Sequence, residues 1–204
     1  MTNLANLNCF EKNEYVSETF IDVEFAAMKL SLKEFEDCTF IDCDFNETVF
    51  NTCKFIDCCF EKCNLSVLQI DNSKFSDVAF KGCKMIGVDW TKAQWPLLAL
   101  SSPVSFEKSN ISDSSFFGLL LEKIEMLGCE AHDVDFREGT FSGGNFSETD
   151  FLNSLFHNTN LTGANFTDST RYSIDVYSNK IRNASFSRFE ALVLLEGLGI
   201  NLVD

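Results

Sequence analysis

The sequence repeats with a period of five residues, and this period limits the folds open to the chain more than any other feature. Counted from Phe10, every fifth residue as far as Trp95 is large and apolar. The register then slips by one residue, and a second apolar series runs from Phe106 to Phe166. Together with three later members, these series hold all but two of the 22 phenylalanines. A helix repeats every 3.6 residues and a strand every two, so neither produces such a column.

A second column of smaller residues lies two positions before each large one. Its members in the first half are Cys38, Cys43, Thr48, Cys53, Cys58, Cys63, Ser73, Val78, Cys83, Val88 and Ala93. The other three positions of each five are mostly polar. The two columns predict a chain that points both residues inward and turns a corner between successive units.

Several units follow one pattern: a small residue, a polar residue, then Leu or Phe, then two more polar residues. Examples are GANFT (163–167), GGNFS (143–147) and KCNLS (62–66). The chain thereby resembles the pentapeptide-repeat family from about Cys9 to Ser187. The resemblance implies an all-β fold, a right-handed quadrilateral β-helix with four units per coil and the large residues inside. About nine coils of 20 residues, spaced by the usual ~4.8 Å between strands, would give a rod roughly 43 Å long.

We therefore expect one repeat domain over residues 1–187, with two irregular places. Residues 96–105 contain both prolines, Pro96 and Pro103, and one residue more than the period allows. Proline removes a backbone N–H from a ladder, so this segment is either a kink between two stacks or a small loop that contacts a partner. The candidate contact residues are Pro96, Leu97, Leu98 and Pro103. The second irregular place lies near 170–180, because the large column fails at Arg171 and returns at Val176.

Residues 188–204 leave the five-residue period and predict a short C-terminal helix. Ser187 and Glu190 have the spacing of a capping box, and Gly197 and Gly199 favour a stop. The helix is too apolar to face solvent alone, so we expect it to cap the open end of the stack and to contribute to a homodimer. The segment LLEGLGI (194–200) resembles the C-terminal tail of Qnr-type quinolone-resistance proteins, in which the tail forms a dimer. The capping and dimer residues are Leu192, Leu194, Leu195, Leu198 and Ile200.

The nine cysteines, six of them between Cys38 and Cys63, follow C-x4-C spacings that suggest either a metal site or disulfides. Seven of them lie two residues before a large residue, so the repeat period itself explains the spacing. A zinc site needs four converging ligands, whereas stacked units place thiols in a row. We therefore expect free thiols that fill small buried positions, with neither metal nor cofactor.

Nothing in the sequence indicates an enzyme. His132 and His157 each follow a large residue and should face solvent, without carboxylate or cysteine partners, and no P-loop or other catalytic motif occurs. The N-terminus lacks the pattern of a signal peptide, and no apolar stretch is long enough for a membrane span. We expect a cytoplasmic, non-enzymatic protein that does not bind a membrane.

The remaining signal is a net charge of −15. With 20 residues per coil, Asp37, Asp57 and Asp77 form one row, while Asp22 pairs with Asp42 and Glu24 with Asp44. Lys62 and Lys84 end the last two rows. The simplest interpretation is a solvated surface that keeps the protein soluble. The functional interpretation is a surface that imitates DNA, because the charge per unit length is about half that of a duplex.

The resemblance to Qnr-type proteins favours the functional interpretation. It implies a partner, DNA gyrase or topoisomerase IV, that the chain protects from quinolones or toxin-type inhibitors, without direct nucleic-acid binding. The chain departs from that pattern in one respect, since Qnr-type proteins carry two longer loops and we expect here only a one-residue slip at 96–105. The alternative is a structural or scaffolding repeat protein that binds a different partner or none.

Overall fold

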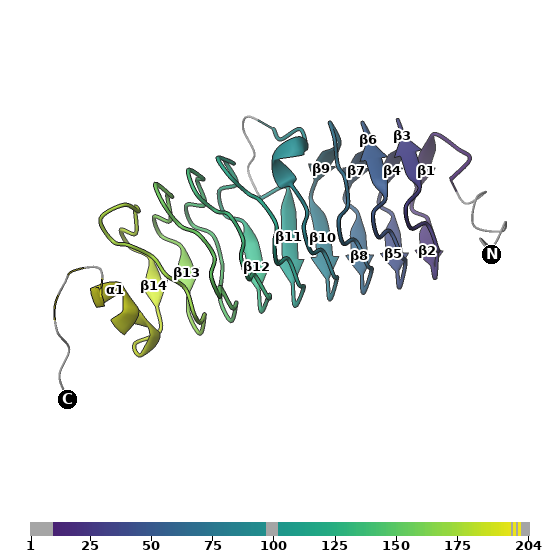
Figure 1. Cartoon of the computed structure of the whole chain (residues 1–204). Helices are drawn as coiled ribbons and strands as arrows, with labels where there is room; N and C mark the ends of the chain where they lie inside the picture. The colour runs from purple at the N-terminus through teal and green to yellow at the C-terminus, as the bar shows by residue number, and fades with distance from the viewer. Residues whose placement is uncertain (1–9, 97–101, 197, 199, 201–204) are drawn as a thin grey trace.

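The computed structural model describes residues 10–96, 102–196, 198 and 200. The chain forms an elongated stack of coils with β2 near one end and the helix α1 at the other (Figure 1). The stack has about eight turns of parallel β-solenoid. The expected β-solenoid with a short C-terminal helix is confirmed.

The strands are short because each side of a coil holds only a few residues before the next corner. The elements are β1 (Glu14–Val16), β2 (Thr19–Ile21), β3 (Lys29–Ser31), β4 (Glu34–Glu36), β5 (Thr39–Ile41), β6 (Val49–Asn51), β7 (Lys54–Ile56), β8 (Cys59–Glu61), β9 (Lys74–Ser76), β10 (Val78–Lys81), η1 (Trp90–Lys92), β11 (Val104–Glu107), β12 (Glu125–Leu127), β13 (Asn165–Phe166), β14 (Ser185–Phe186), η2 (Glu190–Leu192) and α1 (Val193–Glu196). Here η denotes a 3-10 helix.

Each coil has four sides, and each side stacks in parallel on the same side of the next coil. The first side carries the sheet β1-β4-β7-β9, and the second carries β2-β5-β8-β10-β11-β12. The third side is a row of isolated bridges that begins at Glu24 and Asp44, and the fourth side carries β3 and β6. Identical registers, such as Phe35 beside Phe55 and Phe40 beside Phe60, keep every large residue above its counterpart.

The large column forms the core, and its aromatic rings stack along the axis of the rod. The ring centroids of Phe40 and Phe60 are 4.4 Å apart with an interplanar angle of 9°. Phe35 and Phe55 stack at 5.1 Å and 5°. Rings from different sides meet edge to face, as Phe35 and Phe40 do at 70°. Both arrangements are the favourable geometries of aromatic pairs.

The small column is buried as well, and its side chains satisfy backbone carbonyls. Thr48 Oγ1 donates to the carbonyl oxygen of Phe25 at 2.7 Å, and Ser73 Oγ donates to that of Phe50 at 2.8 Å. The thiols do the same, as Cys63 Sγ does to the carbonyl of Phe40 at 3.4 Å. A thiol is a weak donor, so Cys in this column is more than a small hydrophobe.

The residue two positions after each large residue turns the corner, with φ close to +55° over most of the stack. Asp57 has φ 51° and Val67 has φ 54°. Non-glycine residues seldom occupy this left-handed region, where Asn and Asp are the best tolerated and a β-branched residue is an outlier.

The interruption after Trp95 is longer than the period indicates. Phe80 pairs with Phe106, and the hydrogen bond from Cys83 N to Ser109 Oγ spans 26 residues where regular coils span 20. Six additional residues therefore enter this coil. The one-residue slip inferred above was wrong. Five of the six additional residues make up one complete unit, which leaves the five-residue register unchanged, so only the sixth shows in the sequence as a slip.

The coil near Arg171 keeps its length but changes its inward residues. Asp150 bridges Thr170 and Asn160 bridges Lys180, as in a regular coil. Between them, Tyr172 and Ile174 are buried, and Val176 is only partly buried. The outward turn of Arg171 lets its guanidinium pair with Asp150.

The C-terminal helix differs from the predicted capping box. Phe189 occupies the N-cap of η2 without a side-chain hydrogen bond. Ser187 Oγ instead donates to Asp168 Oδ1 at 2.8 Å and accepts from the backbone N–H of Asp168 at 2.8 Å. This serine ties the last coil to the one before it, so it is not available to cap the helix.

Replacing one stacked ring tests the core. Phe55→Ala removes a side chain that is 1% exposed and should lower the free energy of unfolding by about 3–5 kcal/mol. Phe117, which is 47% exposed, provides the control, and Phe117→Ala should change stability by less than about 1 kcal/mol. Urea unfolding followed by circular dichroism measures both, and equal losses would contradict the stacked core.

Reciprocal substitutions test the strain at the corners. Val67→Asn should raise the free energy of unfolding by roughly 1 kcal/mol, because Asn tolerates the left-handed conformation of this 51% exposed residue. Asn72 has φ 57°, and Asn72→Val should lower stability by a similar amount. Thermal unfolding compares the two variants, and shifts of the unfolding midpoint in the same direction would contradict the backbone argument.

Candidate functional site

The acidic residues expected to contact a partner lie on adjoining parts of the rod. Asp37, Asp57 and Asp77 are exposed and stack at the corner between the first and second sides. Asp22 and Asp42 are exposed at the corner between the second and third sides. Asp44 is half-buried on the third side, where it bridges Glu24.

The positions of these aspartates have a backbone cause. Five of them occupy corners with φ between 51° and 53°, namely Asp22, Asp37, Asp42, Asp57 and Asp77. Aspartate is among the residues that enter this conformation most readily, so folding alone favours it there. Stacked corners then bring like charges close together, and Ser17 Oγ donates to Asp37 Oδ2 at 2.7 Å at the top of one column.

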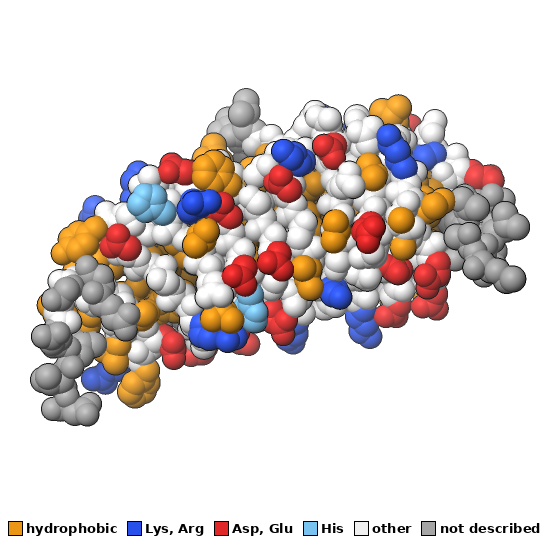
Figure 2. Space-filling model, in the orientation of Figure 1, with side chains coloured by type: hydrophobic (Ala, Val, Ile, Leu, Met, Phe, Trp, Pro, Cys, Tyr) orange, Lys and Arg blue, Asp and Glu red, His pale blue; other side chains and the backbone are white. Residues whose placement is uncertain are grey.

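The charge is distributed unevenly around the rod. On the first side, acids and bases are matched, and Glu34 pairs with Lys54 at 2.7 Å. The second and third sides and the corner between them carry an excess of acids, namely Asp22, Glu24, Asp42, Asp44, Glu61, Glu107, Glu125, Glu130, Glu148, Asp150 and Asp168. Figure 2 shows acidic side chains gathered along the lower side of the rod toward its N-terminal end. These sides, together with the adjoining column of Asp37, Asp57 and Asp77 at the edge of the second side, form the candidate interface.

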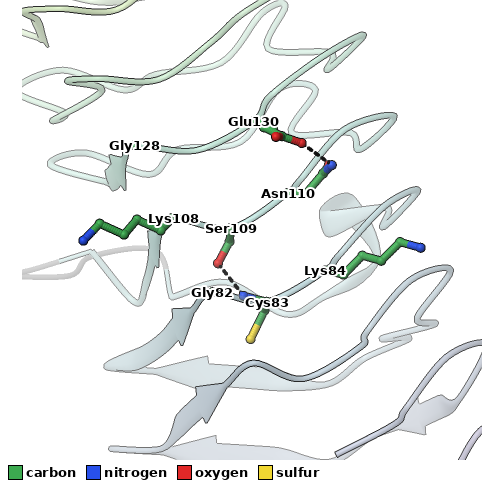
Figure 3. A pocket seen from close by; sticks show the side chains of 8 residues that line it. All are labelled: Gly82, Cys83, Lys84, Lys108, Ser109, Asn110, Gly128 and Glu130. Carbon is green, nitrogen blue, oxygen red and sulfur yellow. Dashed lines mark hydrogen bonds between the residues drawn. The ribbon is translucent and has the colours of Figure 1, made fainter. Parts of the chain in front are cut away.

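A hollow of about 350 Å³ interrupts the acidic surface at mid-rod. It is lined by Gly82, Cys83, Lys84, Lys108, Ser109, Asn110, Gly128 and Glu130. Lys84 and Lys108 lie on opposite rims and extend away from each other (Figure 3). Ser109 Oγ accepts a hydrogen bond from the backbone N–H of Cys83 at 3.0 Å. The hollow therefore lacks the converging, activated groups of an enzyme site.

His132 has partners that the sequence did not indicate. Its Nε2 lies 3.0 Å from Asp150 Oδ2, and Arg171 pairs with the same carboxylate. The expectation of a histidine without a carboxylate was wrong, because Arg171 and Asp150 approach it from successive coils. Among the described residues, Asp150 and Arg171 are the hydrogen-bond partners of the ring, so this cluster contains no nucleophile for the histidine to activate.

A second hollow, of about 510 Å³, opens where the coil near Arg171 is irregular. Arg137, Leu155, His157 and Asp175 are among its lining residues. Arg137 is already engaged by Asp135, at 2.7 and 2.9 Å, and this pairing lowers the pKa of the Asp135 carboxyl. The failure of the five-residue period at Arg171 marks this coil as irregular, but the period does not indicate that a hollow opens there.

The buried thiols stack in separate rows along the rod, with Cys43, Cys63 and Cys83 in one row and Cys38 beside Cys58 in another. Eight cysteines are described, all of them free, and all but Cys59 are buried. Burial raises the pKa of the Cys58 and Cys129 thiols to about 12, so both are neutral and poorly nucleophilic at neutral pH. Within the described residues, no group of three or more His, Cys, Asp or Glu side chains is placed to hold a metal ion.

The remaining predicted site residues divide between exposed and buried positions. Pro96 is exposed and Pro103 is buried, while Leu97 and Leu98 lie outside the described residues. In the C-terminal segment, Leu194 is 9% exposed and belongs to the core, with Leu195 partly buried. Of the other predicted residues of this segment, Leu192, Leu198 and Ile200 are exposed, at 49%, 39% and 50%.

Comparison with known proteins identifies the repeat. A family model described as "Pentapeptide repeat region" matches residues 33–116, and another described as "Pentapeptide repeats (8 copies)" matches residues 129–169. No curated protein matches the chain. Within the described residues, no helix has the length and apolar content of a membrane span.

Solved structures with the same fold cover most of the chain. A trypsin-treated form of QnrB1, a plasmid-mediated fluoroquinolone resistance protein, is 24% identical, with a TM-score of 0.63, over 93% of this chain and 90% of that one. HetL, a pentapeptide repeat protein involved in heterocyst differentiation regulation from Nostoc sp. strain PCC 7120, is 8% identical, with a TM-score of 0.59, over 85% of this chain and 87% of that one. At these identities the similarity shows the fold.

Proposed function

Because the chain belongs to the pentapeptide-repeat family, we propose that it is a non-enzymatic, DNA-mimicking protein that binds a type II topoisomerase. Its effect would be to protect DNA gyrase or topoisomerase IV from quinolones or toxin-type inhibitors. The observation that carries the proposal is the excess of exposed acids on the second and third sides of an elongated rod. The fluoroquinolone-resistance relative of the same fold supports the choice of partner.

The mechanism is electrostatic. Acidic side chains repeat at the coil spacing of ~4.8 Å, so the rod presents regularly spaced negative charge to a basic DNA-binding surface. Such attraction accelerates association and weakens as salt screens it, with a Debye length of about 10 Å at 0.1 M. A rod that occupies the DNA site without being cleaved would reduce the amount of enzyme that an inhibitor can trap on DNA.

Removing one acidic column tests this proposal. The purified chain should restore supercoiling by gyrase in the presence of a quinolone. The variant D37N/D57N/D77N should require roughly tenfold more protein, because three exposed charges contribute about 0.5 kcal/mol each. Asparagine also tolerates positive φ, so the corners keep their conformation and stability should not fall.

A matched variant removes the same charge elsewhere. E14Q/D71N/E122Q changes three acids on the first and fourth sides and should protect gyrase as well as the wild type does. Equal loss in both variants would show that net charge matters and position does not. No protection by the wild-type chain at high excess would refute the proposed function.

We also propose that the C-terminal segment forms the homodimer. Leu194 caps the core, whereas Leu192, Leu198 and Ile200 expose apolar surface at the end of the rod. L192D/I200D should convert a dimer to a monomer in light scattering while leaving the unfolding midpoint nearly unchanged. Leu194→Ala should instead lower stability by about 2–4 kcal/mol. A monomeric wild type would contradict the dimer.

A second candidate function is a structural or scaffolding repeat protein that binds another partner or none. It is favoured by the corner geometry, because the backbone alone accounts for aspartate at Asp22, Asp37, Asp42, Asp57 and Asp77. In this case gyrase should not be retained by the immobilised chain, and cross-linking in cells should recover the same partner after topoisomerase is depleted.

A further inference from the structure

The edge between the second and third sides carries its charges in bands. The corner row reads Asp22, Asp42, Lys62, Gly82, Lys108, Gly128, Glu148 and Asp168 from the N-terminal end. The adjacent row of bridges on the third side reads Glu24, Asp44, Asn64, Lys84, Asn110 and Glu130. Both rows are acidic, then cationic, then acidic again. We name this surface the banded edge, and its cationic band is Lys62, Lys84 and Lys108.

On the third side, neutral residues separate Lys84 from the acids of the same row. Asn64 Nδ2 donates to Asp44 Oδ1 at 3.0 Å, and Asn110 Nδ2 donates to Glu130 Oε2 at 2.6 Å. These amides lie on either side of Lys84 and satisfy the acids that would otherwise pair with it. The ammonium of Lys84 consequently has no ion pair among the described residues and can pair with another molecule.

The other two lysines are similarly available. Lys62, Lys84 and Lys108 are all exposed. Within the described part of the chain, Lys62 and Lys84 have no ion pair within 4.0 Å, and Lys108 has a distant one, 3.8 Å from Glu107. By contrast, Lys54 on the first side pairs with Glu34 at 2.7 Å.

The hollow at mid-rod lies within this band. Gly82 and Gly128, with φ 61° at both, follow Lys62 and Lys108 in the corner row and have no side chain to fill the space. Lys84 and Lys108 stand on the two rims (Figure 3). An acidic protrusion broad enough to cover the hollow would meet the ammonium groups on both rims and would lie between the two acidic bands.

We propose that the banded edge docks a protein surface of the opposite pattern, in which an acidic protrusion lies between two basic patches. This inference rests on the proposed function, and it adds that the topoisomerase surface is not uniformly basic. At ~4.8 Å per coil, the edge from Asp22 to Asp168 spans about 34 Å, and the cationic band occupies about 10 Å of it. A banded surface fixes the position of the rod along its partner, which uniform charge does not.

Nucleic acid does not match this edge. A duplex presents a phosphate charge at about every 1.7 Å. Both acidic bands would repel it, and this repulsion would oppose any attraction to the three lysines. A protein partner can place acids and bases separately, and therefore fits.

Neutralising the lysines gives opposite results for banded and uniformly basic partners. Binding of the full-length chain to gyrase is measured by biolayer interferometry at about 0.1 M salt, where charges still interact over ~10 Å. K62Q/K84Q/K108Q makes the rod more acidic, so a uniformly basic partner would bind it more tightly. A banded partner should instead lose roughly tenfold in affinity.

Two further variants isolate the cause. K29Q/K74Q/K123Q makes the same change in net charge on other exposed parts of the rod, where no ion pair within 4.0 Å is present in the described residues, and should bind within about twofold of the wild type. K62R/K84R/K108R keeps the charge and should retain binding. Circular dichroism checks that all variants remain folded.

If gyrase binds the wild type but binds K62Q/K84Q/K108Q equally or more tightly, the banded edge is refuted and the proposed function stands. If gyrase does not bind the wild type, both fail. Capture of a 30-base-pair DNA duplex that depends on the three lysines would also overturn the assignment to a protein partner.

Discussion

The structure depends on the in-register stacking of coils, in which each large residue lies above its counterpart in the coil before. The pairing of Phe35 with Phe55 and of Phe40 with Phe60 fixes the backbone ladder and the ring stacks together. Ring centroids 4.4 to 5.1 Å apart in these pairs match the spacing of parallel strands. Since each coil contacts only its neighbours, a lost ring weakens two interfaces and the rod has no other core to compensate.

The same stacking converts sequence spacing into surface pattern. Any residue 20 positions further along a regular coil lies directly above the first, so acids repeat as columns and lysines can interrupt them as a band. The corners favour aspartate through their positive φ, and this preference supplies part of the negative charge without selection for a partner. Lys62, Lys84 and Lys108 have no such backbone explanation, since Lys is not favoured at positive φ and Lys84 is not at a corner. Their placement is therefore the more informative feature of the candidate interface.

Irregular coils concentrate the features that the repeat does not explain. The longer coil after Trp95 and the altered coil at Arg171 both preserve the stack on either side. At the second of these, Arg171 joins His132 and Asp150 in a charged cluster, and the displaced register opens a hollow beside Leu155 and His157. A solenoid tolerates such changes because they alter one coil and leave the neighbouring ladders in register.

The sequence by itself determined the inward columns and the acidic rows, because a five-residue period points two side chains in five inward and repeats every contact. Its resemblance to pentapeptide repeats added the solenoid. The sequence also explained the C-x4-C spacing as the repeat itself. Only the tertiary structure decided the true length of the longer coil, since five added residues leave the period unchanged. It likewise decided that Ser187 bonds Asp168 rather than capping the helix, and that Lys108 joins Lys62 and Lys84. Those outcomes depend on contacts between neighbouring coils, whose residues are distant in sequence.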